Sequence, residues 1–234
     1  MALLLFGVAV ASSLIFSTFV YPRIAGALNS RIAEDGYDLL ALGLYHLGTL
    51  TYYPNETPTV MRGPAYPAFV AAILFLGEHL YPRSVQLAQA LVHGVTAVLC
   101  FFISMALWNR RRASFVAASV CAVHPFLLWY TARIVTETLA VFLFTLFVAA
   151  LFWYGRAPST MRAAVAGVVG GLGALCKQTL LPLPLLTFLF LVLRKKDYRL
   201  HHGIVLIIGT LVVLAPWTGR NFSVTQKIIP VHTL

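Results

Sequence analysis

The chain has 234 residues, of which 60% are hydrophobic and only 10% are charged. A soluble protein with this composition would expose more apolar surface than it could bury, and disordered, collagen-like and coiled-coil chains have quite different compositions. The composition therefore indicates a polytopic membrane protein.

The net charge of +10 does not indicate nucleic-acid binding. The basic residues lie between apolar runs, as membrane topology requires, and no recognition helix or Cys/His metal spacing accompanies them. The three cysteines, Cys100, Cys121 and Cys176, all lie inside apolar runs. This placement is typical of small packing residues and argues against a disulfide framework.

Uncharged runs define the candidate spans in chain order. The first, residues 2–20, nearly crosses a hydrocarbon core and lacks both the basic start and the cleavage site of a signal peptide, so it predicts a retained span. Further runs cover residues 84–109, 113–132, 138–155 and 203–219. The region 163–193 is interrupted by Lys177, and neither side of that lysine is a comfortable span alone.

Three basic clusters determine how these runs are threaded through the membrane: Arg110-Arg111-Arg112, Arg156 with Arg162, and Arg194-Lys195-Lys196 with Arg199. The positive-inside rule places all three in the cytoplasm, so an even number of crossings must separate each pair. Residues 163–193 then form two short spans with Lys177 at their outer tip. We predict an all-α bundle of seven spans within a single transmembrane domain, residues 1–234, with the N-terminus inside and the tail, residues 220–234, outside.

The loop at residues 21–83 is then extracytoplasmic. Its apolar stretch 39–45 predicts a short interfacial helix that follows an acidic segment, Glu34-Asp35-Gly36-Tyr37-Asp38. Residues 63–77 are too short for a comfortable span, and counting them as one would place the arginine triplet outside. Their early prolines, Pro64 and Pro67, suit the start of a second interfacial helix.

This topology gathers ionisable residues on the outer face: Glu34, Asp35, Asp38, Arg62, Arg83, Arg133, Glu137, Lys177 and Arg220. If the helices converge there, these side chains line a cavity at the depth of the lipid headgroups. In such a cavity the cations can hold a lipid phosphate, and a carboxylate can take a proton from an attacking hydroxyl.

The motifs on which a family resemblance rests are, in chain order, the acidic segment followed by Leu40-Ala41, then Arg62-Gly63-Pro64-Ala65-Tyr66-Pro67, the basic turn 109–112, Thr136-Glu137, residues 171–177, and Pro216-Trp217-Thr218-Gly219-Arg220-Asn221. Their order resembles that of the N-terminal half of GT-C superfamily glycosyltransferases. The branch in question includes protein O-mannosyltransferases and the lipid A aminoarabinose transferase. The resemblance covers nearly the whole chain.

The resemblance implies a membrane enzyme that transfers a sugar, with inversion, from a polyprenyl-phosphate donor to an acceptor hydroxyl on the extracytoplasmic face. It implies that an acid in the first outer loop is the base or organises the cavity. Carried over, Asp35 is the predicted base and Glu34 its neighbour, here in the order Glu-Asp and not the commoner Asp-Glu. Arg62 and Lys177 are the predicted phosphate partners. The predicted substrate-binding and phosphate-binding set is completed by Arg133, Glu137, Arg220 and Asp38.

The expected partners are the polyprenyl-phosphate sugar donor, membrane lipids, and a lipid, glycan or protein acceptor. The expected location is the inner membrane of a prokaryote or the endoplasmic reticulum of a eukaryote. No definite cofactor is indicated, although a carboxylate pair could hold a divalent cation. Family members are usually longer, with more spans and a C-terminal outer domain, so we expect this chain to be incomplete at its C-terminal end.

Some of these residues also have simpler interpretations. Asp35 can be a solvated loop acid that caps the following helix, and Asp38 a first-turn helix acid. Arg133 and Glu137 are four residues apart, which fits an ion pair on a helix surface. Arg62 can anchor an interfacial helix to headgroups.

Structural roles are expected for several other polar residues. Gln86, Gln89 and His93 form a polar stripe that favours interhelical hydrogen bonds. His124-Pro125 is expected to mark the outer end of the third span, and His201-His202 to face the headgroups.

Two alternative functions are kept beside the transferase. One is a multipass transporter, whose charges would lie nearer the bilayer midplane within inverted repeats. The other is a non-catalytic lipid-binding or assembly subunit.

Overall fold

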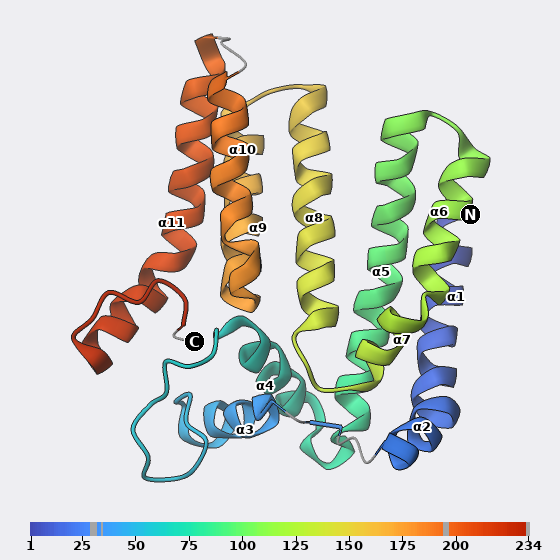
Figure 1. Cartoon of the computed structure of the whole chain (residues 1–234), viewed down its shortest axis with the longest axis vertical. Helices are drawn as coiled ribbons and strands as arrows, with labels where there is room; N and C mark the ends of the chain where they lie inside the picture. The colour runs from blue at the N-terminus through green and yellow to red at the C-terminus, as the bar shows by residue number, and fades with distance from the viewer. Residues whose placement is uncertain (29–31, 34, 194–196, 233–234) are drawn as a thin grey trace. The chain divides into compact units, whose positions relative to one another are not determined.

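The computed structural model describes residues 1–28, 32–33, 35–193 and 197–232. Every regular element in these ranges is a helix, which confirms the all-α prediction. The chain divides into two compact units (Figure 1). Unit 1 comprises Met1–Thr57 and Tyr66–Phe142, and unit 2 comprises Pro58–Ala65 and Leu143–Leu234.

Unit 1 is built on helices that pack around α5. Its elements are α1 (Ala2–Ile15), the π-helical turn η1 (Phe16–Val20), α2 (Tyr21–Leu28), α3 (Tyr37–Leu47), α4 (Ala65–Gly77), the 3-10 turn η2 (Glu78–Leu80), α5 (Arg83–Trp108), α6 (Arg111–Val123), α7 (Pro125–Ala132) and the start of α8 (Glu137–Arg156). α5 packs against both α1 and α6 (Figure 1). Small residues permit this closeness: Ala9, Ala97 and Ala122 form one buried cluster across the three helices.

None of the three cysteines forms a disulfide. Cys100 on α5 and Cys121 on α6 lie with their Sγ atoms 3.8 Å apart, so these thiols pack helix against helix. The structure thus agrees with the packing role predicted from the sequence.

Unit 2 is built around the pair α9 (Thr160–Cys176) and α11 (Asp197–Thr225), together with the rest of α8, the 3-10 turn η3 (Gln178–Leu180) and α10 (Pro182–Leu193). α11 packs along α9. The contact depends on glycine, because a Cβ atom at Gly167 would collide with the carbonyl oxygen of Leu206. Close packing of small residues is how helices associate where lipid removes the hydrophobic driving force.

His202 lies on α11, and its side chain faces into unit 2 and not toward the lipid headgroups. Its side chain is buried, and its Nδ1 lies 3.1 Å from the hydroxyl of Tyr154 on α8. The expectation for His202 is therefore wrong, because α11 begins before the apolar run and carries this histidine inside the helix contact. His201, its neighbour, is exposed.

Helices occupy all seven ranges predicted to span, but their lengths differ. Four are long and apolar enough to cross a membrane: Ala2–Ala27, Arg83–Trp108, Glu137–Arg156 and Leu200–Thr225. α6 and α7 make a fifth if this pair, bent by 43°, counts as one span. α9 and the segment Gln178–Leu193 are shorter apolar helices. Among the described residues the count is therefore four or five, and the seven-span topology stays a prediction.

The two helices predicted in the first loop are present. α3 ends at Gly48, whose φ of 69° is the left-handed conformation that glycine adopts readily. α4 starts at Ala65 with Pro67 in its first turn, where a missing N–H costs no hydrogen bond. The position of α3 and α4 at a membrane interface stays a prediction.

The break at His124-Pro125 is not the end of the helical segment. α6 stops at Val123, and α7 begins at once with Pro125 in its first position. Proline disrupts the interior of a helix, because it lacks the backbone N–H that would donate to the preceding turn. It is well suited to the first position of a new helix, where that N–H is not needed. The chain therefore bends at this point and continues as helix to Ala132.

The polar stripe of α5 satisfies backbone carbonyls that these helix ends leave free. Gln86 donates to Ala132 O at 2.8 Å, and Gln89 donates to Thr131 O and Arg133 O at 3.1 and 2.7 Å. His93 Nε2 lies 3.2 Å from Ala122 O. In a membrane an unpaired carbonyl is costly, so the stripe allows the breaks to exist. The prediction of interhelical hydrogen bonds is confirmed.

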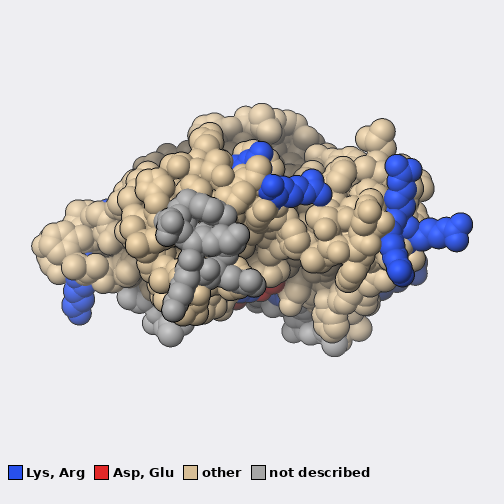
Figure 2. Space-filling model, turned by 90° about the horizontal axis from the view of Figure 1, so that it is seen from above, with Lys and Arg blue, Asp and Glu red and all other residues tan. Residues whose placement is uncertain are grey.

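Basic side chains are prominent in the view of Figure 2, where almost no Asp or Glu is visible. In unit 1, Arg110, which caps α6, and Arg111 and Arg112, in the first turn of α6, are all exposed. In unit 2, Arg162 stacks 4.6 Å from the Trp153 ring and donates to the Trp153 and Ala157 carbonyls. The cluster Arg194-Lys195-Lys196 lies outside the described residues. The cytoplasmic location of these clusters stays a prediction.

Candidate catalytic and phosphate-binding residues

The acidic segment begins helix α3. Asp35 is exposed and Asp38 lies in the first turn, as predicted, whereas Glu34 lies outside the described residues. The residue at the N-cap is Gly36, with φ 71°, and it makes no side-chain capping bond. The interpretation of Asp35 as the helix cap is therefore wrong.

Buried aromatic rings anchor this segment to α5. Tyr37 packs edge-on against Tyr66, with ring centroids 5.4 Å apart, and the Tyr66 hydroxyl donates to Gln89 Oε1 at 2.9 Å. Both tyrosines are buried. Gln89 also donates to the carbonyls at the end of α7. The Gln89 side chain therefore helps to position both the acidic segment before α3 and the Arg133 segment after α7.

The same two segments also touch through their backbones. Ile134 N–H donates to Ile32 O at 2.8 Å. Ile32 lies three residues before Asp35, and Ile134 lies between Arg133 and Glu137. Within unit 1, the structure thus joins the segment that precedes Asp35 to the Arg133–Glu137 connection.

Arg133 and Glu137 do not share a helix. α7 ends at Ala132 and α8 begins at Glu137, with Arg133 in extended conformation between them. The shared helix suggested by their spacing is therefore wrong, because the residues between them are not helical. Both side chains are half-buried. The Arg133 guanidinium lies 5.8 Å from the ring of Trp129, and Thr136 donates to Glu137 Oε2 at 3.4 Å.

Tyr81, which follows α4 and η2, lies close enough to Asp38 to sense its charge. Burial raises the pKa of the Tyr81 hydroxyl above its ordinary value, and the Asp38 carboxylate raises this pKa further. The Asp38 charge therefore acts on Tyr81, which the sequence did not indicate.

In unit 2, Arg62 and Lys177 are carried by segments in contact. A Cβ atom at Gly63 would collide with the carbonyl oxygen of Leu175. Ala65 packs against the buried cluster to which Ala174 and Leu175, at the end of α9, belong. Lys177 follows α9 directly, in extended conformation, before the turn η3. Both Arg62 and Lys177 are half-buried, so two cations predicted to hold a phosphate lie on adjoining segments.

Arg220 holds one of these segments in place. Its Nη1 donates to Thr59 O at 2.7 Å and to Asn221 Oδ1 at 3.1 Å, and its guanidinium lies 4.6 Å from the Trp217 ring. Thr59 precedes Arg62 by three residues. Arg220 was predicted as a phosphate partner, and its contacts show that it ties the Arg62 segment to α11.

The rest of the motif around Arg220 folds the tail back onto α11. Asn221 is fully buried and donates to Ile229 O and Val231 O at 3.0 and 3.2 Å. The Trp217 indole also donates to Val231 O. Sequence reasoning identified the motif but not this role, because its partners lie in a tail with no pattern of its own.

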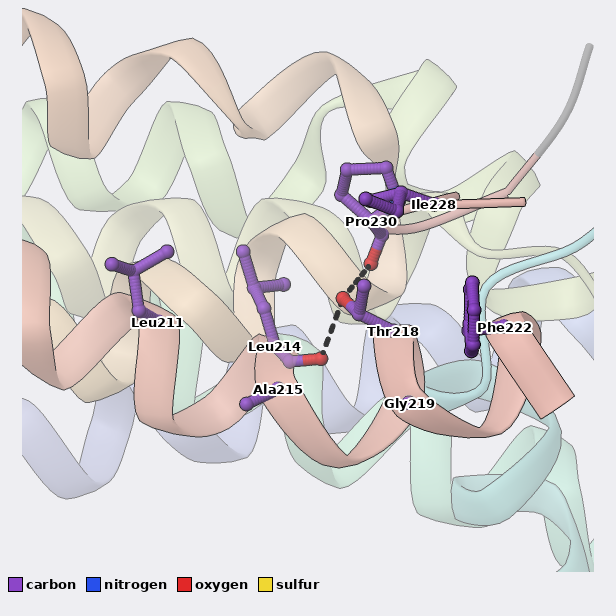
Figure 3. Close-up of a pocket in the computed structure, with 8 residues that line it drawn as sticks. All are labelled: Leu211, Leu214, Ala215, Thr218, Gly219, Phe222, Ile228 and Pro230. Carbon is purple, nitrogen blue, oxygen red and sulfur yellow. Dashed lines mark hydrogen bonds between the residues drawn. The ribbon is translucent and has the colours of Figure 1, made fainter. Parts of the chain in front are cut away.

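A cavity of about 590 Å³ lies between α11 and this tail (Figure 3). Its lining is Leu211, Leu214, Ala215, Thr218, Gly219, Phe222, Ile228 and Pro230. Thr218, the only hydroxyl in this lining, already donates to Leu214 O at 3.0 Å and Pro230 O at 3.2 Å (Figure 3). The cavity is thus a hydrophobic surface without a placed reactive group.

The structure assembles the candidate residues in two sets. Unit 1 carries Asp35, Asp38, Arg133 and Glu137, and unit 2 carries Arg62, Lys177 and Arg220. The meeting of the two sets stays a prediction. Across the described parts of the chain, no three His, Cys, Asp or Glu side chains are grouped so that they could hold a metal ion.

Residues 61–219 match the family model described as dolichyl-phosphate-mannose-protein mannosyltransferase. The chain belongs to this mannosyltransferase family. Neither the curated proteins nor the solved structures gave a match.

Membership of the mannosyltransferase family confirms the resemblance drawn from the motifs and identifies the chain as a multi-pass membrane protein of the glycosyltransferase type. The matched range contains Arg62, Arg133, Glu137 and Lys177. It begins after Asp35, so it does not itself assign a role to that acid.

Proposed function

We propose that this protein transfers a sugar from a polyprenyl-phosphate carrier to an acceptor hydroxyl on the extracytoplasmic face of the membrane. The observation that carries the proposal is the family match over residues 61–219, because the family description names a sugar linked to a lipid phosphate. The transporter alternative lacks comparable support.

Asp35 is the proposed base. Its carboxylate is exposed on a turn that Tyr37 and Tyr66 anchor to α5. The acceptor oxygen would form its bond to the anomeric carbon while the bond from that carbon to the phosphate oxygen breaks. The hydroxyl proton would pass to Asp35, and one displacement would invert the anomeric centre.

Arg62 and Lys177 are the proposed partners of the donor phosphate. Negative charge grows on this phosphate as it departs, and fixed cations in a partly desolvated site stabilise such charge. Both side chains are half-buried on segments that touch at Gly63 and Leu175. Arg220 supports this arrangement through its bond to Thr59 O.

The proposal separates chemistry from donor binding, and two variants test the separation. Asp35→Asn should lower transfer from radiolabelled polyprenyl-phosphate mannose to membrane acceptors by about 10²-fold or more, with donor binding unchanged. Lys177→Gln should weaken donor binding itself. Glu56→Gln is the matched control, because Glu56 is an exposed acid of the same loop.

Each result bears on one part of the proposal. Full activity of Asp35→Asn in membranes that hold the whole chain would remove Asp35 from the mechanism. Donor binding by the wild-type protein without any transfer would favour the lipid-binding subunit instead.

A further inference from the structure

Val231 lies in the tail that follows α11, and its side chain is buried where two segments of unit 2 meet. It is 1% exposed. Its buried neighbours come from α9 and α11: Ala174, Leu175 and Leu214. Val231 Cγ1 also lies 3.7 Å from the position that a Cβ atom at Gly63 would take. Val231 therefore packs against both the end of α9, which leads to Lys177, and the segment that carries Arg62.

The same cluster holds the Lys177 turn on both sides. Leu175 precedes Lys177 by two residues, and Leu181, which follows the turn η3, packs against the cluster. Within the turn, Lys177 N–H donates to Gly173 O and Leu180 N–H donates to Lys177 O, each at 2.9 Å. Because both flanks of Lys177 belong to one packed cluster, the place of its backbone depends on how that cluster is filled.

Polar contacts with α11 fix the tail at Val231. Asn221 donates to Ile229 O at 3.0 Å and to Val231 O at 3.2 Å, and the Trp217 indole also donates to Val231 O. Residues 226–232 form neither helix nor strand, so side-chain donors from α11 replace the backbone partners that regular structure would supply. These bonds set how far the Val231 side chain reaches into the cluster.

Arg220 extends this arrangement to the Arg62 side. Its Nη1 donates to Asn221 Oδ1 at 3.1 Å and to Thr59 O at 2.7 Å. Thr59 lies three residues before Arg62, so the residue that orients the Asn221 amide also holds the backbone of the Arg62 segment. Two routes therefore join α11 to this segment, one through Arg220 and one through Val231.

We propose that Val231 is a positioning residue for the donor phosphate: its side chain sets the spacing of the Arg62 and Lys177 segments, and Asn221 holds it there. The inference rests on the proposed function, in which these two cations bind the phosphate. Val231 has no charged or polar side-chain group, so it acts only through the packing of the two segments. Groups that bind one ligand from separate segments must be held to within about 0.5 Å by side chains that packing locks in place.

The test compares kinetic constants for transfer from radiolabelled polyprenyl-phosphate mannose in membranes that hold the whole chain. Val231→Ala should raise the KM for the donor by about tenfold, with a smaller change in kcat, since the donor contacts are displaced and the base is not. Val231→Ile, which keeps an apolar contact with both segments, should retain most of the wild-type affinity. Val224→Ala is the matched control, because Val224 is an exposed valine of α11 outside the cluster.

Two further variants separate positioning from a merely structural role, in which loss of folded protein would lower the apparent kcat and leave the donor KM unchanged. Asn221→Ala leaves every side chain of the cluster in place but frees the tail carbonyls, so it should raise the donor KM even if Val231→Ala fails to fold. In a Lys177→Gln background, Val231→Ala should raise the donor KM much less than in the wild type, because one of the cations that it positions is gone.

The outcomes distinguish this inference from the proposed function. An unchanged donor KM in Asn221→Ala and in folded Val231→Ala would overturn the inference, as would an equal rise with and without Lys177→Gln, and both results would leave the proposed function standing. If the wild-type protein neither binds nor transfers the donor, or if Lys177→Gln leaves the donor KM unchanged, the assigned phosphate site is wrong and the inference fails with it.

Discussion

Gln89 is the side chain on which the acid-bearing part of unit 1 depends. It is 1% exposed, accepts from Tyr66, and donates to the carbonyls of Thr131 and Arg133. Gln89→Leu keeps the volume and removes all three bonds. We expect a loss of about 2–3 kcal/mol in the free energy of unfolding, since three buried polar groups lose their partner. Unfolding in mixed micelles by titration with sodium dodecyl sulfate measures this change.

Tyr66→Phe serves as the graded control for Gln89. It removes only the hydroxyl that Gln89 accepts from, and so it should cost about 1 kcal/mol. If Gln89→Leu were no more destabilising than Tyr66→Phe, the two carbonyl contacts at the α7–α8 connection would not stabilise the fold.

The proximity of Tyr81 and Asp38 predicts a pH effect. Burial and the Asp38 charge raise the folded-state pKa of Tyr81 above its ordinary value of 10.0. The folded protein therefore binds this proton more tightly than the unfolded chain, so the associated stability is fully present below about pH 10 and is lost as the pH rises beyond it. Asp38→Asn should lower this pKa, and the phenolate absorbance assigned by comparison with Tyr81→Phe should begin at lower pH.

Glu78→Gln is the control for that titration. Glu78 lies three residues before Tyr81 but pairs with His46 at 3.2 Å, and its charge is not among the causes of the Tyr81 shift. An equal shift in both variants would mean that Asp38 does not face Tyr81 specifically.

At the scale of elements, the α9–α11 contact should be sensitive to a single methyl group. Gly167→Ala would place a Cβ atom against the Leu206 carbonyl oxygen and strain the adjoining bond from Thr210 Oγ1 to Gly167 O. Backbone cannot yield as a side chain does, so we expect about 2–3 kcal/mol of destabilisation. Thermal unfolding in detergent measures it.

Gly155→Ala is the matched control for Gly167. Nothing lies within 4 Å of a Cβ atom at Gly155, which is also helical. Alanine is the better helix former, so this variant should be unchanged or slightly more stable. A comparable loss of stability in both variants would mean that the close approach of α9 and α11 is not what makes Gly167 necessary.

The helices could be predicted from the sequence because uncharged runs are what a bilayer requires. Their ends were less predictable. The run 138–155 became Glu137–Arg156, since an acid suits the first turn of a helix and a base suits the last. The run 203–219 became Asp197–Thr225, because polar residues can extend a helix beyond the hydrocarbon. Charge marks where a span leaves the membrane, not where the helix ends.

For the whole molecule, the sequence identified the kinds of residue in the site but not their contacts. Arg220 looked like the other outer cations, yet it bonds to Thr59, which is 161 residues away. Asp35 looked like a helix cap, yet Gly36 takes that position. Such roles depend on which segments meet in space, and a motif read along the chain does not contain that information. The family match succeeded because it needs only order and spacing.

The number of crossings is the whole-molecule property that remains a prediction, and it depends on residues 160–193. α9 has 17 residues, about 25 Å of helix against a hydrocarbon core of about 30 Å. If α9 and α10 both cross, the bilayer must thin locally or the half-buried Lys177 must reach upward to the interface, and both adjustments are modest in cost. The basic clusters on either side of this hairpin favour two crossings.

Single cysteines in a background without Cys100, Cys121 and Cys176 test this topology with a membrane-impermeant maleimide. The exposed positions Asn55 and Thr179 should react in intact cells, whereas Arg111 and Ala157 should react only after permeabilisation. Thr179 is decisive, because it adjoins Lys177 at the turn between the short helices. Reaction of Thr179 together with Arg111 would mean that α9 and α10 re-enter from the cytoplasm. Lys177 would then lie on the cytoplasmic side and could not bind a donor phosphate outside.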